Sequence, residues 1–357
     1  MEESYIFLMD SVEYFRTLLS IPSPSWKEDG MSSFITRTMA SFGYQFVDDA
    51  AGNLLFFLPG KGERPMLASH MDTVPLALTP HVIETDTHFM TDGNTALGAD
   101  NKATTAAMLA AAEKHLNACF LFTRAEEVGL QGSKKLTAEF FAPFRISMAF
   151  VPDAEGHVGT VITSAPGKDT INTVINGRTA HAGFSPESGR NAIQAAAIAI
   201  SRSPSGRIDD ETTCNIGMIS GGSSTNTVPD RAEYRYEVRS LDNSKRNRIS
   251  SLIISEAEKA AKEMECTADI IRTELYSPYI IPDDSKAKSA AKAAIKALGM
   301  EYREKATSGG SDTNNIRALG IDAITLTSGY EHPHSTKERI EKAQLIALER
   351  LLSALAG

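Results

Sequence analysis

The sequence predicts an α/β fold whose larger domain is built on a mostly parallel, doubly wound sheet and is interrupted by a smaller α+β domain. In residues 1–167 and 276–357, short apolar strands alternate with helices, which is typical of a parallel sheet covered by helices. In residues 168–275 the order is strand, helix, strand, strand, helix, strand, which is the split βαβ arrangement. A chain of 357 residues is also longer than one hydrophobic core usually supports.

The first part of the larger domain begins with two predicted helices. Residues 5–20 place apolar side chains at helical spacing, and this helix ends at Ile21-Pro22 because proline disfavours helix in the residue before it. Residues 29–42 form the second helix, which Gly43 closes. Strands are expected near 53–58, 65–70, 118–123 and 146–151, with helices at 101–116 and 132–141 between them.

The inserted domain and the return to the larger one follow the same kind of reasoning. In the insert, strands are expected at 169–177, 214–220, 232–241 and 267–273, and helices at 192–201 and 248–261. The larger domain then resumes with a helix at 285–298, a strand at 301–305, a helix at 311–319 and a strand at 321–327. The larger domain is therefore predicted to be discontinuous in sequence.

Composition excludes several classes of protein. The net charge of −9 argues against nucleic-acid binding, because no basic surface would offset phosphate repulsion. No apolar run approaches the length of a membrane span, and the N-terminal residues carry acids where a signal peptide carries bases. The three cysteines are far apart and lie in or beside apolar runs, as reduced core thiols do. We therefore expect a cytoplasmic protein that binds neither nucleic acid nor membrane.

A histidine or an acidic residue follows an apolar stretch in five separate segments. In open α/β sheets, ligands bind beyond the carboxyl ends of the strands, so these residues are expected to converge on one site. Adjacent carboxylates repel each other, and a bound cation would explain why two glutamates stand together after the strand at 118–123. A solvated glutamate pair in a loop is the alternative. The candidate metal ligands are His70, Asp100, Glu127, Asp153 and His334.

The types of ligand indicate which metal the site would hold. Nitrogen and oxygen donors without cysteine suit zinc, with cobalt or manganese as alternatives. Five protein ligands are too many for one tetrahedral ion that keeps a position for water, so two ions sharing one carboxylate are expected. Asp100 is the natural bridge because it lies at the start of a helix after an apolar segment. His332 competes with His334 for the last ligand position.

Two further acidic residues have predicted roles beside the metals. Glu126 would remain unligated next to the activated water, which is the position of a general base. Asp72 stands two residues after His70 and could orient that imidazole.

The candidate residues lie in six segments that stand in a fixed order along the chain. The segments are His70-Met71-Asp72-Thr73-Val74, Leu97-Gly98-Ala99-Asp100-Asn101-Lys102, Thr123-Arg124-Ala125-Glu126-Glu127-Val128-Gly129, Val151-Pro152-Asp153-Ala154-Glu155-Gly156, Ser308-Gly309-Gly310-Ser311-Asp312 and His334-Ser335-Thr336-Lys337-Glu338. Together they resemble the di-zinc metallopeptidases of the peptidase T and glutamate carboxypeptidase type, and the resemblance spans nearly the whole chain. Gly329-Tyr330-Glu331 adds a resemblance to the peptidase T-like aminopeptidases.

The resemblance implies an αβα catalytic domain interrupted by a ferredoxin-like lid and dimerisation domain. It implies that His70 and Asp153 bind one ion and that Glu127 and His334 bind the other, with Asp100 bridging them. It assigns the base to Glu126 and the support of the histidine to Asp72. It also implies a cis peptide bond after the bridging aspartate.

The resemblance implies a homodimer formed through the lid. His181 would stabilise the developing oxyanion, in the site of the partner subunit as in related dimers or in its own, and a loop histidine that only makes local hydrogen bonds is the alternative. The residues implied in substrate binding are Asn226, Arg239, Gly309 and Gly310.

The expected function is hydrolysis of a peptide bond in short peptides by a metallo-exopeptidase, with a tripeptidase-like aminopeptidase as the first choice. A carboxypeptidase or an amidohydrolase acting on N-acyl amino acids would use the same metal centre, since specificity lies outside it. A catalytically silent metal-binding protein is the alternative from another class.

Overall fold

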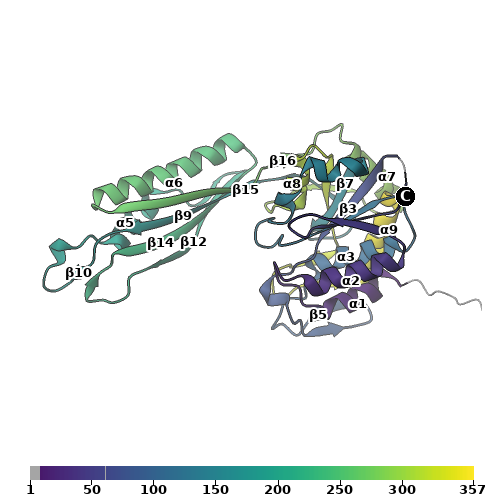
Figure 1. Ribbon diagram of the computed structural model, residues 1–357, viewed down its shortest axis with the longest axis horizontal. Coiled ribbons are helices and arrows are strands. Elements are labelled where there is room, and N and C mark those ends of the chain that lie inside the picture. The colour runs from purple at the N-terminus through teal and green to yellow at the C-terminus, as the bar shows by residue number, and fades with distance from the viewer. Residues whose placement is uncertain (1–8, 61) are drawn as a thin grey trace, which may run out of the picture. The chain divides into compact units, whose positions relative to one another are not determined.

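The computed structural model describes residues 9–60 and 62–357 and divides into two compact units (Figure 1). The larger unit comprises Met1–Ser164, Ile280–Thr307 and Ser311–Gly357, and the inserted unit comprises Ala165–Tyr279 with Ser308–Gly310. The predicted domain boundaries lay after residues 167 and 275. The inserted unit therefore extends a few residues beyond the predicted boundaries at both ends, and it also includes Ser308–Gly310.

The main sheet of the larger unit is parallel at its centre, with an antiparallel pair on either side of this centre, while the outer strand β17 pairs parallel with β8. Its order is β1-β2-β6-β3-β7-β18-β8-β16, and β17 pairs with β8. The neighbours β6, β3, β7 and β18 run parallel, whereas β2 pairs antiparallel with β6, and β8 with β18. The strands are β1 (Gln45–Asp48), β2 (Leu54–Phe57), β3 (Arg64–His70), β6 (Cys119–Thr123), β7 (Ile146–Ala154), β8 (Thr160–Ala165), β16 (Tyr279–Ile280), β17 (Arg303–Ala306) and β18 (Ala323–Thr327).

Helices cover both faces of this sheet, as the predicted αβα arrangement requires. Residues of alternating orientation in β2, β3, β6 and β7 pack with Phe141 of α4 and Ile316 of α8 on one face. On the other face, α3 is buried along almost its whole length and packs against α1 and α9. The helices are α1 (Ser11–Leu19), α2 (Asp29–Ser41), α3 (Ala99–Ala112), α4 (Ala138–Phe141), α7 (Lys286–Ala297), α8 (Asp312–Ala318) and α9 (Lys342–Ala356).

Several expected elements differ in extent. The helix predicted for 132–141 is wrong as one helix, because a 3-10 turn at Ser133–Lys135 ends before extended Thr137, whose hydroxyl caps α4 by accepting from Phe140 N–H. The helix predicted for 5–20 is observed as α1, capped by Asp10, and residues 5–8 lie outside the described residues. A small sheet of β4 (Val82–Glu84), β5 (His88–Thr91), β19 (Tyr330–Glu331) and β20 (Arg339–Glu341) was not predicted.

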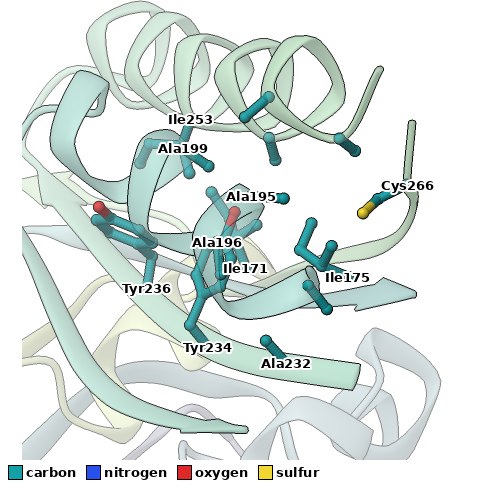
Figure 2. Close-up of a cluster of buried hydrophobic side chains, with 14 of the residues drawn as sticks. Ile171, Ile175, Ala195, Ala196, Ala199, Ala232, Tyr234, Tyr236, Ile253 and Cys266 are labelled. Carbon is teal, nitrogen blue, oxygen red and sulfur yellow. The ribbon is translucent and has the colours of Figure 1, made fainter. Parts of the chain in front are cut away.

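The inserted unit is an antiparallel sheet with two helices on one face. Its order β11-β12-β14-β9-β15, with α5 and α6 between strands, confirms the predicted ferredoxin-like α+β arrangement. Figure 2 shows side chains of β9 and β14 pointing from the sheet towards the alanines of α5 and towards Ile253 of α6. The elements are β9 (Gly167–Asn176), β10 (Ala180–His181), α5 (Ala192–Arg202), β11 (Gly206–Asp209), β12 (Thr212–Gly221), β13 (Thr227–Val228), β14 (Arg231–Ser240), α6 (Asn243–Glu263) and β15 (Thr267–Tyr276).

Two chemical features of the fold bear on the earlier expectations. All three cysteines are buried free thiols. Within the described part of the chain, no helix combines the length and the apolar character that a membrane span requires.

Candidate metal centre

The predicted metal ligands meet at one edge of the main sheet in the larger unit. His70 ends β3, Glu127 follows β6, and Asp153 lies near the end of β7. Because β6, β3 and β7 are parallel neighbours, their carboxyl ends lie at the same edge. Asp100 stands at the start of α3, and His334 follows β19.

Asp100 lies between the two histidines. Its Oδ1 is 3.2 Å from Nε2 of His70, and its Oδ2 is 3.2 Å from Nε2 of His334. The Nε2 atom of His70 is also 3.3 Å from Oδ1 of Asp153, and that of His334 is 2.9 Å from Oε1 of Glu127. Each histidine thus meets Asp100 and one further carboxylate, which is the arrangement expected of two ions sharing a bridging aspartate.

The electrostatics of the cluster fit a site for cations. Burial, with the neighbouring Asp100 and Asp312 carboxylates, raises the pKa of Asp153 to about 8 even though His70 opposes this shift. Burial and the Asp153 carboxylate raise the pKa of Glu126 well above its usual range. Hydrogen bonds to Asp100 and Glu127 raise the pKa of His334 to about 10. Carboxylates this crowded bind protons in the absence of a metal, and divalent ions would replace those protons.

The tautomer of His70 is determined by its contact with the backbone. Its Nδ1 lies 2.9 Å from the carbonyl oxygen of Asp72, which can only accept, so Nδ1 is the donor. Burial would lower the pKa of His70, but the Asp153 and Asp100 carboxylates raise it well above its ordinary value. In the neutral ring the lone pair is on Nε2, which faces Asp100 and Asp153 and is the atom a metal would take.

Asp72 supports the site in a second way that was not predicted. Its buried carboxylate accepts the backbone N–H groups of Glu126 at 2.9 Å and Glu127 at 3.2 Å, and the hydroxyl of Ser25 at 2.6 Å. The same residue therefore holds the pair of glutamates through its side chain and the histidine through its carbonyl, and its Oδ1 also lies 3.4 Å from Nδ1 of His70.

Sequence reasoning missed two residues that position the ligands. Asn101 donates to Oδ1 of Asp153 at 3.0 Å and to the carbonyl of Pro152 at 2.8 Å. Glu338 accepts the N–H groups of Leu97, Gly98 and Asp100, at 2.8, 2.8 and 3.1 Å. The segment containing Glu338 was recognised, but nothing in it indicated which loop the carboxylate would bind. The peptide bond between Asp100 and Asn101 is cis, as the resemblance implied.

The predicted lid residues lie in the inserted unit. His181 and Asn226 are neighbours, since β10 pairs with β13 and the N–H of Ala182 donates to the carbonyl of Asn226 at 2.9 Å. Nδ1 of His181 accepts the N–H groups of Gly183 and Phe184 at 3.1 and 3.2 Å. The neutral imidazole therefore carries its proton on Nε2 and can donate a hydrogen bond from that atom.

The other residues implied in substrate binding, Arg239, Gly309 and Gly310, form a separate group in the inserted unit. The guanidinium of Arg239 contacts Glu237, with Nε 3.0 Å from Oε1, and donates to the carbonyl of Ser308 at 2.9 Å. At Gly310, a Cβ atom would overlap with the ring of Tyr276, so only glycine fits. Gly309 stands in the sequence between Ser308, which accepts from Arg239, and Gly310, which packs against Tyr276. Each of the three guanidinium nitrogens of Arg239 thus has one protein partner, which accounts for three of its five N–H groups.

Comparisons with known proteins agree with this fold and site. Residues 163–265 match the M20 family described as "Peptidase dimerisation domain". The uncharacterised protein YqjE of Bacillus subtilis (strain 168) is 33% identical over 361 residues, covering 96% of each chain.

Two solved structures are similar over almost the whole chain. The aminopeptidase PepT from Bacillus cereus has a TM-score of 0.83 at 34% identity, covering 97% of both chains. A tripeptidase from Staphylococcus aureus has a TM-score of 0.87 at 32% identity, covering 97% of this chain and 96% of that one. This chain therefore belongs to the M20 family and is a metal-dependent peptidase of the peptidase T type.

Proposed function

We propose that the protein is a di-zinc exopeptidase that removes the N-terminal residue from short peptides, as a tripeptidase does. The observation that carries the two-metal proposal is the position of Asp100, which presents one carboxylate oxygen to each of two histidines. The aminopeptidase and tripeptidase names of the two similar structures support the choice of substrate end.

The described ligands divide into two sets around Asp100. His70 and Asp153 would hold one ion, and Glu127 and His334 the other. Bound divalent ions would supply Lewis acidity, which polarises a carbonyl and makes water acidic near neutral pH. His334 rather than His332 fills the last position in this proposal, because its Nε2 faces both Asp100 and Glu127.

Glu126 is the proposed general base. Asp72 anchors its backbone at the end of β6, so the carboxylate is held beside the ligands while Glu127 contacts His334. Burial and the neighbouring Asp153 carboxylate raise its pKa, which brings the group closer to the range in which it can both accept and return a proton. Glu126 would take the proton of the attacking water and give it to the leaving amine.

Metal analysis followed by a substrate panel tests this function. We expect zinc to be recovered with the protein and free tripeptides to be cleaved after their first residue. Tripeptides with a blocked N-terminus should resist, while those with a C-terminal amide should still be cleaved. The opposite pattern would indicate a carboxypeptidase, hydrolysis of N-acyl amino acids alone would indicate the amidohydrolase, and metal binding without any turnover would indicate a silent metal-binding protein.

We also propose that the protein is a homodimer formed through the inserted unit. Within the described residues, β11 pairs with β12 only as far as Cys214, so Asn215–Gly221 present an open outer edge. Ile219 on this edge is 60% exposed, and Met218 is exposed beside it. An exposed apolar edge strand is a template for pairing with a second strand. His181, with a donor at Nε2, would then act in the site of the partner subunit.

Disruption of the β12 edge tests the dimer. Ile219→Lys should give a monomer in sedimentation velocity, because a buried lysine at the interface would lack a partner. Ile271→Lys is the matched control, since Ile271 is also exposed but lies on β15 at the opposite edge of the same sheet. A wild-type monomer, or an Ile219→Lys dimer of unchanged stability, would contradict the proposed interface.

A further inference from the structure

Trp26 has an unusual backbone conformation. It is the only tryptophan of the chain, its φ is +67°, and the residue is 48% exposed. A left-handed conformation is disfavoured for a bulky residue, and an exposed indole gains little from burial. Such outliers persist where the surrounding structure over-determines them, and they are concentrated at functional sites.

The loop that carries Trp26 is tied to the strand end that carries the glutamates. The N–H of Trp26 and the N–H of Ala125 both donate to Oε1 of Glu28, each at 2.9 Å. The hydroxyl of Ser25 and the N–H of Glu127 both donate to Oδ2 of Asp72, at 2.6 and 3.2 Å. The loop and the strand end thus share two buried carboxylates.

The strand end that shares these carboxylates with the Trp26 loop continues into a second exposed apolar residue, Val128. Val128 follows Glu127 as Trp26 follows Ser25, and Val128 is 49% exposed. Ser25 and Glu127 thus bind the same oxygen of Asp72, and each is followed in the sequence by an exposed apolar residue, Trp26 or Val128. Val128 directly follows the proposed metal ligand Glu127, and Trp26 shares Oε1 of Glu28 with Ala125, the residue before the proposed base Glu126. Both residues belong to the larger unit.

We infer that Trp26 and Val128 form an apolar face that receives the side chain of the substrate's N-terminal residue. The inference rests on the proposed aminopeptidase function and narrows its substrates to peptides with a large apolar first residue. The held loop would keep the indole at the rim before substrate arrives, so little conformational freedom is lost on binding. Burial of apolar surface between the two side chains and the substrate supplies the preference.

The preference can be measured with three tripeptides, Leu-Gly-Gly, Ala-Gly-Gly and Glu-Gly-Gly. We expect the wild-type kcat/KM for Leu-Gly-Gly to exceed that for Glu-Gly-Gly at least tenfold. In Trp26→Asn the ratio of kcat/KM between Leu-Gly-Gly and Ala-Gly-Gly should fall at least fivefold, mainly through KM. Asparagine tolerates the left-handed conformation, so this variant tests the indole rather than the loop. Trp26→Phe should restore most of the ratio.

Phe46→Asn is the matched control, because Phe46 is an aromatic residue of similar exposure, 45%, on the edge strand β1. Its Leu to Ala ratio should equal that of the wild type. Cleavage of all three peptides at equal rates, or an unchanged ratio in Trp26→Asn, would overturn this inference and leave the aminopeptidase function intact. Cleavage of none of them would instead contradict the proposed function.

The single tryptophan also allows a test without a substitution in the loop. In the zinc-loaded Glu126→Gln variant, Leu-Gly-Gly should shift the emission of Trp26 saturably, whereas Glu-Gly-Gly at the same concentration should not. Binding of Leu-Gly-Gly, detected by calorimetry, without any change in emission would contradict the inference.

Discussion

Asp72 explains at the residue scale why two glutamates can stand side by side at the end of β6. Its carboxylate accepts both of their backbone N–H groups, and its carbonyl accepts from Nδ1 of His70. The hydrogen bonds place the two carboxylates without neutralising them. Their mutual repulsion is relieved when one of them binds a proton or meets a cation, and Glu127 is the one whose carboxylate contacts His334.

Replacing Glu126 separates proton transfer from metal binding. We expect Glu126→Gln to keep its zinc content and to lose about 10²–10⁴-fold in kcat, the usual contribution of a positioned base. Elemental analysis and steady-state kinetics on a tripeptide measure the two effects. The matched variant Glu127→Gln should instead lose metal. Near-normal turnover of Glu126→Gln would remove Glu126 from the mechanism.

Glu338 is the second residue whose effect can be predicted. Burial and the Asp100 carboxylate raise its pKa to about 7, against the three backbone N–H groups that it accepts. In Glu338→Gln an amide NH₂ would face a backbone donor, and a buried unsatisfied group costs about 1–3 kcal/mol. We expect a lower melting temperature and a zinc affinity reduced by roughly 10–100-fold, because Asp100 loses its support.

Zinc titration and thermal unfolding measure the effect of Glu338→Gln. Glu331→Gln is its control, because Glu331 pairs with Arg339 at the surface and should change neither quantity appreciably. Equal behaviour of the two variants would show that Glu338 does not position the Asp100 loop.

At the scale of elements, a buried arginine of α6 stabilises the packing of this helix on the sheet of the inserted unit. Arg246 is 1% exposed, lies 3.2 Å from Asp169 and 2.8 Å from Glu274, and donates to the carbonyl of Tyr276 at 2.9 Å. These contacts connect α6 with β9 and β15. A Cβ atom at Gly167 would overlap with the guanidinium, which explains the glycine at the start of β9.

Removing this guanidinium should destabilise the protein strongly. Arg246→Ala removes one of the two guanidiniums that pair with buried Asp169 and leaves Arg272 and Ser250 as its partners. The loss should therefore approach, without reaching, the cost of an unpaired buried charge, about 3–5 kcal/mol. Denaturant unfolding of the metal-loaded protein measures the change. Arg202→Ala, which breaks an exposed pair with Glu263, should have little effect. A similar loss in both variants would contradict the argument.

At the scale of the whole molecule, metal and protons compete for the same ligands. Asp153 has a raised pKa of about 8 against an ordinary 3.8, and His334 one of about 10 against 6.5. For each residue, at any pH between its ordinary and its raised pKa, the group holds more protons in the metal-free folded state than in the unfolded chain. The free energy of unfolding therefore falls as pH rises from about 4 through 8 for Asp153, and from 6.5 through about 10 for His334.

We accordingly expect the metal-free protein to melt at a lower temperature at pH 8 than at pH 6. Adding zinc should raise the melting temperature more at pH 8, since fewer protons must be displaced. Thermal unfolding after chelation, with and without restored zinc, measures both trends. Comparing the two forms at each pH cancels the groups outside the site. A larger zinc effect at pH 6 would contradict the placement of the ions on these residues.

Much of the fold was predictable because its signals are local. The apolar run Cys119–Thr123 predicts a buried strand. The predicted metal ligands are histidines and acidic residues that follow such runs, and these residue types can be recognised from the sequence as possible ligands. The helix expected at 132–141 was wrong because a side-chain cap at Thr137 outweighed the helical pattern.

The sequence by itself determined the α/β class, the insertion and the set of residues able to bind metal, since periodicity and ligand chemistry are properties of short segments. Only the tertiary structure decided that Glu338 holds the loop of Asp100, that Asn101 holds Asp153, and that Glu237 engages Arg239. It also decided that Trp26 stands beside the glutamates. These partners depend on how strands and loops pack, and packing joins residues distant in the chain that no local pattern connects.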